Sequence, residues 1–434
     1  MTTTYSIKSD ILDKDKNSSV TYSLTRPRLK LLSHSTSVQR SADGYDVCIP
    51  VYISPPSNVR SVLVRIPLPY KVGEAKSPGN VDEKLRCEVA SYLWIQENCP
   101  DVSIPYLFGF GFSNGQTIQQ TSLFIRSMWC GCTGEMLSNT WETFRHDKTR
   151  RSNLFHGLAR IILSLNKSPL AAIGSLTLND QGFTTLANRP LTLQIQSLEN
   201  EGIPTTIGRG STYSAVEPYL LDLLSCHDNR ISFQPNAIHD QDDGEQQMAA
   251  LTMMRAVLHH FCPRDSRYRP FVFIFTDLHQ SNIFVDNNWH ITSLIDLEWS
   301  CSLPIQLQCP PYWLSGRAID QMELGEHLEA FHQLVLEYLE AFEQEERDIA
   351  GKGLHQAPIL RKCWESGSFW YFHAINSPKG LCRVFTEHIQ RLFFVAPYWR
   401  VGAAEEIKRK IEEEERYKHQ LKEVFSAEVT LLNA

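Results

Sequence analysis

The chain has 434 residues, of which 42% are hydrophobic and 21% charged, and its formal net charge at pH 7 is −7. This length allows a large buried core in two or three domain-sized units. No long basic run is present, and binding to a nucleic-acid backbone needs clustered Lys and Arg, so nucleic acid is not expected as the main partner.

The eleven cysteines are scattered, and only Cys130 and Cys132 lie close together. A C-x-C pair without a second pair is weak support for zinc, so free thiols in a reducing compartment are expected. Residues 1–10 lack the apolar core of a signal peptide, and no stretch approaches the roughly 20 apolar residues of a membrane span. We therefore expect a soluble cytoplasmic protein with no membrane partner.

The first part of the chain predicts a small unit rich in strands. Residues 1–34 are polar and rich in Ser, Thr and Lys, which predicts a flexible segment. The unit then runs from 35 to 126. Strand and helix periodicity predicts two strands, a helix and a further strand at 47–53, 61–67, 82–96 and 121–126.

The second part, 127–400, predicts a larger and mainly helical unit. Apolar stripes indicate helices at 153–165, 215–224, 244–260 and 323–344, and alternation at 173–178 indicates a hairpin. The segment 179–212 is expected to be loop-rich. A charged helix at 405–418, within a C-terminal segment 401–434, is expected to be a solvated face with no function of its own.

The segment 271–299 contains the candidate catalytic and metal-binding residues. It predicts strand, polar loop, strand, turn and strand, followed by a second acidic loop. Asp277 lies in the first loop, Asn282 follows five positions later, and the last strand leads to Asp296. A carboxylate that orients an attacking hydroxyl, with an amide oxygen and a carboxylate that hold Mg²⁺, suits phosphoryl transfer from ATP.

These motifs resemble the aminoglycoside phosphotransferase family, in particular its fungal members. Asp277-Leu-His279 with Asn282 matches that family's D-L-H-x-x-N, and Ile295-Asp-Leu-Glu-Trp299 matches its I-D-W/L-E. The resemblance implies an α+β, protein-kinase-like fold with a small β-rich N-lobe and a larger, mainly helical C-lobe. It also implies ATP and Mg²⁺ as cofactors, and transfer of the γ-phosphoryl group to a hydroxyl of a small-molecule substrate.

The resemblance assigns roles residue by residue. Asp277 becomes the catalytic base, and Asn282 and Asp296 become the Mg²⁺ ligands. In a kinase-like fold a basic residue on a strand binds the phosphates and pairs with a Glu on the next helix. Arg65 and Glu88 are the candidates, with Arg in place of the usual Lys.

Other positions have structural or weaker expectations. The phosphate-covering loop, 41–45, has a single glycine, Gly44. Adenine is expected to contact the connection at 125–130. His279 is expected to pack or hydrogen-bond within its loop, and Glu298 to pair with a nearby basic group. After Asp296, two aromatic side chains could stack on a substrate, although packing onto the core is the commoner role: Tyr312 and Trp313.

Two alternatives remain open. Phe275 stands where many kinase-like enzymes have a His, and together with the glycine-poor loop it favours a pseudokinase that acts as a binding or scaffold protein. The intact Asp277, Asn282 and Asp296 oppose that interpretation. A protein kinase is the other alternative, but no A-P-E segment follows Asp296. The identity of the acceptor is not readable from the chain.

Overall fold

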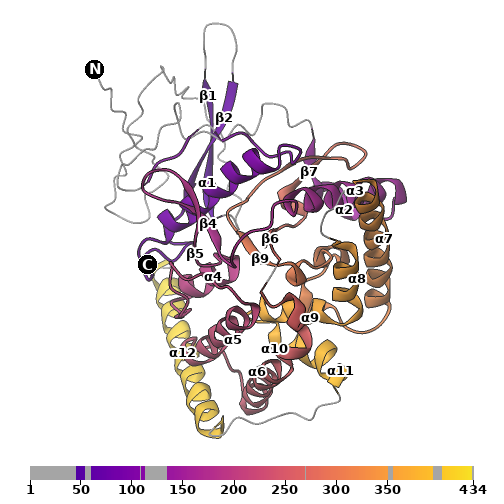
Figure 1. Cartoon of the computed structure of the whole chain (residues 1–434). Coiled ribbons are helices and arrows are strands. Elements are labelled where there is room, and N and C mark those ends of the chain that lie inside the picture. Colours follow the sequence, from indigo (N-terminus) through magenta and orange to yellow (C-terminus); the bar gives the residue numbers. More distant parts are fainter. Residues whose placement is uncertain are drawn as a thin grey trace, which may run out of the picture.

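The computed structural model of the protein describes residues 45–53, 60–107, 109–112, 134–268, 270–349, 355–393 and 403–432. Its strands, shown in Figure 1, are β1 Asp46–Ile53, β2 Arg60–Pro67, β3 Glu135–Met136, β4 Ser175–Leu178, β5 Thr184–Asn188, β6 Phe271–Phe275, β7 Ile283–Val285, β8 Ile291–Leu294 and β9 Ser300–Pro304. Its α-helices are α1 Asn80–Asn98, α2 Leu137–Phe144, α3 Lys148–Leu165, α4 Leu193–Glu201, α5 Val216–Phe233, α6 Gln241–Phe261, α7 Glu326–Asp348, α8 Ala357–Glu365, α9 Ser368–Ile375, α10 Leu381–Val384, α11 Gln390–Phe393 and α12 Ala403–Leu432.

The small lobe contains the β1–β2 hairpin and helix α1. The two strands pair antiparallel, with Cys48 opposite Arg65 and Asp46 opposite Pro67. The predicted strands and helix are confirmed, and α1 extends slightly beyond its predicted ends. The predicted strand 121–126, the connection 125–130, Gly44 and all three predicted domain boundaries lie outside the described residues.

The larger lobe is mainly helical, as predicted. Helices α3 and α6 include the predicted helices, while α5 and α7 begin one and three residues later than predicted and extend further toward the C-terminus. Asp147 caps α3 by accepting hydrogen bonds from the backbone N–H groups of Thr149 and Arg150, which explains where this helix begins. The α+β fold class, with a small sheet-bearing lobe and a larger helical lobe, is confirmed.

The prediction that 179–212 is loop-rich is wrong in part. Strand β5 pairs with β4, and helix α4 follows it. Thr192 caps α4 by accepting a hydrogen bond from Ile195 N–H, and the helix ends at Gly202 with φ of +80°. These two residue types are the usual start and stop signals of a helix, but α4 is too short for a clear apolar stripe.

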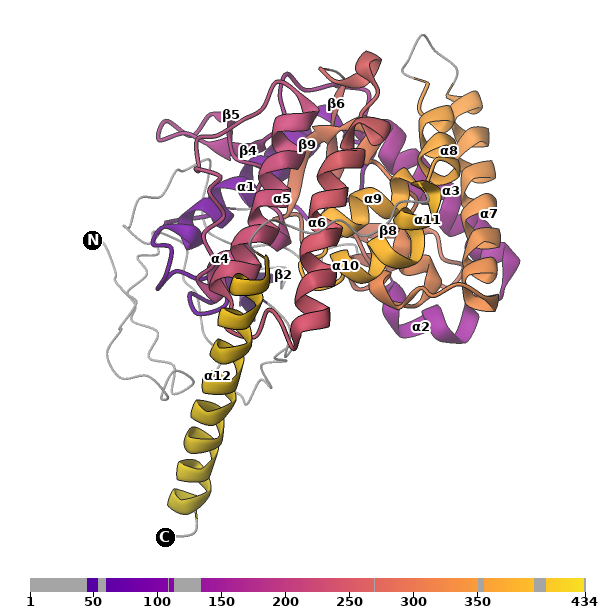
Figure 2. The ribbon, with the colours of Figure 1, turned by 90° about the horizontal axis from the view of Figure 1, so that it is seen from below.

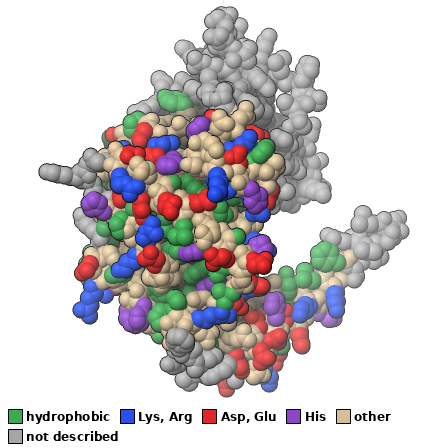
Figure 3. All heavy atoms as spheres, turned by 90° about the vertical axis from the view of Figure 1, so that its right-hand side faces the viewer, with side chains coloured by type: hydrophobic (Ala, Val, Ile, Leu, Met, Phe, Trp, Pro, Cys, Tyr) green, Lys and Arg blue, Asp and Glu red, His purple; other side chains and the backbone are tan. Residues whose placement is uncertain are grey.

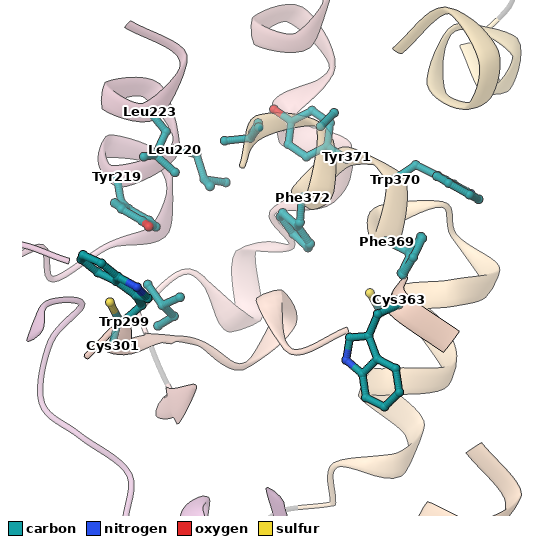
Figure 4. Packing of buried hydrophobic residues seen from close by; sticks show 14 of the residues in the cluster. Tyr219, Leu220, Leu223, Trp299, Cys301, Cys363, Phe369, Trp370, Tyr371 and Phe372 are labelled. Atoms are coloured by element: carbon teal, nitrogen blue, oxygen red, sulfur yellow. The ribbon is translucent and has the colours of Figure 1, made fainter. Parts of the chain in front are cut away.

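The core joins the end of the segment 271–299 to the helices. Figure 4 shows Trp299 and Cys301 in one cluster with Tyr219 and Leu223 of α5, while Phe372 of α9 belongs to the same cluster. Trp299 is 2% exposed and Cys301 is fully buried. The chain that follows Asp296 is therefore anchored in a rigid interior.

Helix α12 includes the predicted charged helix but is longer than expected. Its first turns dock on the body, where Ile407 and Lys410 are buried and Lys410 Nζ donates to the carbonyl of Gln234 at 2.7 Å. The expectation of a fully solvated helix is therefore wrong for this end. The rest projects from the body (Figure 2).

On the face shown in Figure 3, basic and acidic side chains are interspersed over the described surface. Within the described part of the chain, no helix is both long and apolar enough to cross a membrane. The eight cysteines in this described part are free thiols and form no disulfides.

Candidate active site

Two strand pairs hold the candidate catalytic residues. β6 pairs antiparallel with β9, and the pairing continues past the strand ends because Thr276 N–H donates to the carbonyl of Trp299 at 3.0 Å. β7 pairs with β8, and Ile295 N–H extends this pair by donating to the carbonyl of Asn282 at 3.0 Å. Asp277 thus follows one strand end directly, while Asn282 and Asp296 flank the other pair.

The carboxylate of Asp277 is only partly exposed, at 23% of its side chain. Burial raises its pKa to about 7, with further contributions from the negative charges of Glu298 and Asp296. His279 Nε2 lies 4.0 Å from Asp277 Oδ1, while His279 Nδ1 accepts a hydrogen bond from Ser281 N–H at 3.2 Å. His279 therefore hydrogen-bonds within its loop, as predicted.

Asn282 is 4% exposed and is tied to the same loop. Its Nδ2 donates to the backbone carbonyl of Asp277 at 2.9 Å. The amide nitrogen is thereby used inside the loop, and Oδ1 is the atom of this side chain that can ligate a cation.

Asp296 has an unusual backbone conformation. Its φ is +57°, a left-handed value that Asp and Asn adopt more readily than other non-glycine residues. Its side chain is 35% exposed, whereas the next two residues, Leu297 and Glu298, are almost fully buried. The turn therefore presents the Asp296 carboxylate at the surface of an otherwise buried segment.

Arg65 has four carboxylate partners rather than one. Its Nη1 lies 2.6 Å from Asp296 Oδ1 and 3.4 Å from Glu88 Oε1. Its Nη2 lies 3.0 Å from Glu298 Oε1 and also contacts Asp46. The predicted Arg65–Glu88 pair is present but is the longest of the four contacts, so the role assigned to Glu88 alone is shared among four acids.

Lys84 was not predicted as part of this site, although it is fully buried. Its Nζ lies 3.1 Å from both carboxylate oxygens of Asp46 and 3.3 Å from Glu298 Oε1. Burial alone would lower the pKa of Lys84, but these two carboxylates raise it above its ordinary value. Because positions four apart share one helix face, the spacing of Lys84 and Glu88 on α1 was the available sequence signal.

Together these side chains form what we call the charge network: Asp46, Arg65, Lys84, Glu88, Asp296 and Glu298. Among the described residues of this network, two cations are shared by four carboxylates. Buried charge is costly unless it is paired, so these contacts hold the strand β2, the helix α1 and the segment after β8 together.

The donor set can be compared with what Mg²⁺ requires. Among the described residues there is no group of three or more His, Cys, Asp or Glu that could hold a metal ion. Mg²⁺ commonly binds through one or two protein oxygens and completes its shell with water and substrate phosphates. Asn282 Oδ1 and the partly exposed carboxylate of Asp296 fit that pattern.

No family model and no curated protein matches the chain. Solved structures do match. The ADP-bound aminoglycoside phosphotransferase APH(2'')-Ib is 11% identical with a TM-score of 0.36, and the match covers 84% of this chain and 93% of that chain.

Two further matches have similar extent. The macrolide 2'-phosphotransferase MphH from Brachybacterium faecium is 8% identical with a TM-score of 0.34, covering 83% of this chain and 92% of that chain. Ethanolamine kinase of Plasmodium vivax is 13% identical with a TM-score of 0.33, covering 80% and 83%. Each is named as a phosphotransferase or kinase of a small molecule. Because the TM-scores lie below 0.5, the function proposed below depends on the geometry of the site itself.

Three further positions were singled out in the sequence: Trp313, Tyr312 and Phe275. Trp313 is buried and packs edge-on against Trp141 at 5.5 Å, so it packs the loop onto the core. Tyr312 is only partly buried, and the Asp277 charge contributes, after burial, to its raised pKa. Gln280, in the loop between Asp277 and Asn282, donates through Nε2 to the carbonyl of the neighbouring Trp313 at 3.2 Å, so Tyr312 lies beside the loop of Asp277. Phe275, at the end of β6, packs edge-on against Phe273 in the core.

A second polar cluster fixes helix α1 from the side of the larger lobe. Arg189 is 3% exposed and donates to both carboxylate oxygens of Glu83 on α1, each at 2.9 Å. It also donates to Glu199 on α4 at 2.6 and 2.9 Å. Asn80 joins the same cluster through Glu199 Oε2 at 2.9 Å. Arg189 thus connects α1, which carries Lys84 and Glu88, to the larger lobe.

Replacing Arg189 by Met is expected to lower the free energy of unfolding by about 3–5 kcal/mol, because it removes the buried cation shared by Glu199 and Glu83 and leaves Glu83 with the exposed Arg209. Chemical denaturation measures this change. Arg209→Met is the matched control, since Arg209 shares Glu83 at 2.9 Å but is 43% exposed, and an exposed pair is worth about 1 kcal/mol or less. Equal losses in the two variants would contradict a special role for Arg189.

Proposed function

We propose that this protein is an ATP-dependent phosphotransferase that moves the γ-phosphoryl group of Mg-ATP to a hydroxyl of a small-molecule acceptor. The observation that carries the proposal is the placement of two acids, Asp277 and Asp296, at the ends of neighbouring strand pairs in different surroundings. Asp277 has a pKa near 7, suited to accepting a proton, and Asp296 is the partly exposed carboxylate at the edge of the charge network. The motif resemblance supports the same reaction.

Asp277 would orient the acceptor hydroxyl and take its proton as the oxygen attacks. The Asn282 side chain fixes the Asp277 backbone through the 2.9 Å hydrogen bond, and would offer Oδ1 to the metal beside Asp296. When bound, Mg²⁺ would neutralise charge on the phosphates. Arg65 would bind a phosphate oxygen, and Glu88 with Lys84 and its partners would keep the site assembled. Catalysis would come mainly from alignment and charge neutralisation.

The acceptor is proposed to bind on the Tyr312 side of Asp277. The Tyr312 ring packs edge-on against His373 at 5.3 Å, and burial lowers the pKa of His373 to about 4, so this histidine is neutral. The carboxylates that raise the Asp277 pKa, Glu298 and Asp296, belong to the charge network instead. This side would therefore offer an aromatic and uncharged surface to the acceptor.

Tyr312→Ala is expected to lower kcat/KM for the acceptor by about tenfold, because an aromatic contact of this kind is worth about 1 kcal/mol or more. The affinity for ATP should not change. Steady-state kinetics with both substrates separates the two effects, and Tyr268→Ala, at a position 60% exposed, is the control. A loss confined to ATP affinity would contradict the placement of the acceptor.

The nucleotide site can be tested without knowledge of the acceptor. Titration calorimetry of ATP is expected to show binding that is much tighter with Mg²⁺ than without it. Absence of binding under both conditions would overturn the proposal and turn the search to protein partners. One observation favours that second function, a pseudokinase: Arg65 lies directly on Asp296 Oδ1, the carboxylate that the metal would need.

A further inference from the structure

Arg65 and a metal ion would compete for Asp296. Arg65 Nη1 lies 2.6 Å from Asp296 Oδ1, a short, charge-assisted contact. Asp296 is also the most exposed carboxylate of the charge network, at 35% of its side chain, against 10% for Glu88 and 3% for Asp46 and Glu298. The one carboxylate that a cation from solution can reach is therefore already paired.

The other contacts of the charge network would allow the guanidinium of Arg65 to move away from Asp296. Its Nη2 contacts Asp46 and Glu298 Oε1, and Lys84 Nζ contacts the same two acids at 3.1 and 3.3 Å. These buried carboxylates would keep a cation if the guanidinium moved. Of the other two partners, Glu88 is the more distant, at 3.4 Å, and Asp296 would be taken over by the metal.

We propose that Arg65 is a built-in counterion that neutralises Asp296 in the empty site and is exchanged for Mg²⁺ when a nucleotide arrives. The phosphates then give the displaced guanidinium a new anionic partner, for which its planar fork is well suited. Metal and nucleotide binding become coupled, and linkage requires that each raises the affinity for the other by the same factor. The inference rests on the proposed function for the identity of the nucleotide, but the competition at Asp296 does not.

The competition is measured with Mn²⁺ alone, followed by electron paramagnetic resonance. Removing a charge-assisted hydrogen bond on the ligating carboxylate is expected to raise the Mn²⁺ affinity of Arg65→Gln about tenfold or more over wild type. Arg361→Gln is the control, because it makes the same charge change at an arginine of α8 that pairs with Glu343 of α7. Equal Mn²⁺ affinity in Arg65→Gln and wild type would overturn the proposal.

A second variant guards against misfolding. Arg65→Gln leaves four carboxylates with one cation, whereas Arg65→Gln/Glu88→Gln restores the net charge of the network, and it is expected to show the same gain in Mn²⁺ affinity. Repeating the titrations with ADP should show strong mutual enhancement in wild type and little in either variant. If wild type bound Mn²⁺ but no ADP, the proposed function would fail while the Mn²⁺ comparison still decided the competition. If ADP bound normally and the variants matched wild type, only the counterion proposal would fail.

Discussion

Asp277→Asn is expected to reduce phosphoryl transfer by about 100- to 10,000-fold while nucleotide affinity stays almost unchanged. Asparagine preserves the shape of the side chain but cannot accept the proton of the attacking hydroxyl, and a positioned general base contributes a factor of this size. Steady-state kinetics and calorimetry on the same preparations separate the two quantities. A variant that keeps most of its turnover would remove Asp277 from the mechanism.

The same substitution has a predicted effect on stability. Because the folded-state pKa of Asp277, about 7, lies above its ordinary value of 3.8, the unfolded chain loses this proton first as the pH rises. Wild type therefore loses stability between about pH 4 and 7, and the penalty persists above pH 7. Asp277→Asn should be more stable than wild type by about 2 kcal/mol at pH 8 and by much less at pH 4.

Denaturation at the two pH values measures this difference, and Asp286→Asn provides a control of opposite sign. Burial would raise the pKa of Asp286, but hydrogen bonds from His290 and from the backbone of Asn288 lower it below its ordinary value. Its ionised form stabilises the fold at pH values above the ordinary Asp pKa, so this control should lose stability at pH 8. A destabilised Asp277→Asn at pH 8 would contradict the raised pKa.

Asp296→Asn is expected to abolish the dependence of nucleotide binding on Mg²⁺ and to reduce turnover to background. The amide lacks the charge that attracts a divalent cation, and Asn282 alone is a weak site for a metal that prefers carboxylates. Calorimetry of ATP with and without Mg²⁺ measures the change. Persistent Mg²⁺ dependence in the variant would place the metal elsewhere.

Asn is chosen at this position because it removes the carboxylate charge without straining the backbone. The φ of Asp296 is +57°, which Asn adopts readily, whereas Ala would add backbone strain. Arg65 keeps its contacts with Asp46, Glu88 and Glu298 in this variant, so the substitution leaves no buried cation without a carboxylate. The variant should therefore unfold at the same temperature as wild type or above it, as calorimetric melting would show.

The residues that the sequence predicted best lie in one short, locally determined segment. The strands around Asp277, Asn282 and Asp296 are short runs of apolar and β-branched residues, and their loops are fixed by neighbours close in the chain. Their chemical roles remain predictions. Glu88 was predicted as a partner of Arg65, but the other partners could not be found in this way, because Glu298 is 233 positions away and Asp46 lies on a different strand.

The ion pairs that attach α1 to the larger lobe could not be predicted from the sequence either. In the sequence, Arg189 is a single basic residue between a strand-like and a helix-like segment. Only the fold brings Glu83 and Glu199 into contact with it. Buried ion pairs of this kind depend on tertiary contacts, which leave no periodic trace in the sequence.

Phosphoryl transfer by this protein can be tested by following the fate of γ-labelled ATP. Wild type and Asp277→Asn would be incubated with labelled ATP, Mg²⁺ and a broad mixture of hydroxyl-bearing metabolites, and small molecules would then be separated from protein. We expect label in a small molecule, and slow release of phosphate to water without acceptor, in wild type alone. Label found only in protein, or no turnover above the level of Asp277→Asn, would contradict this expectation.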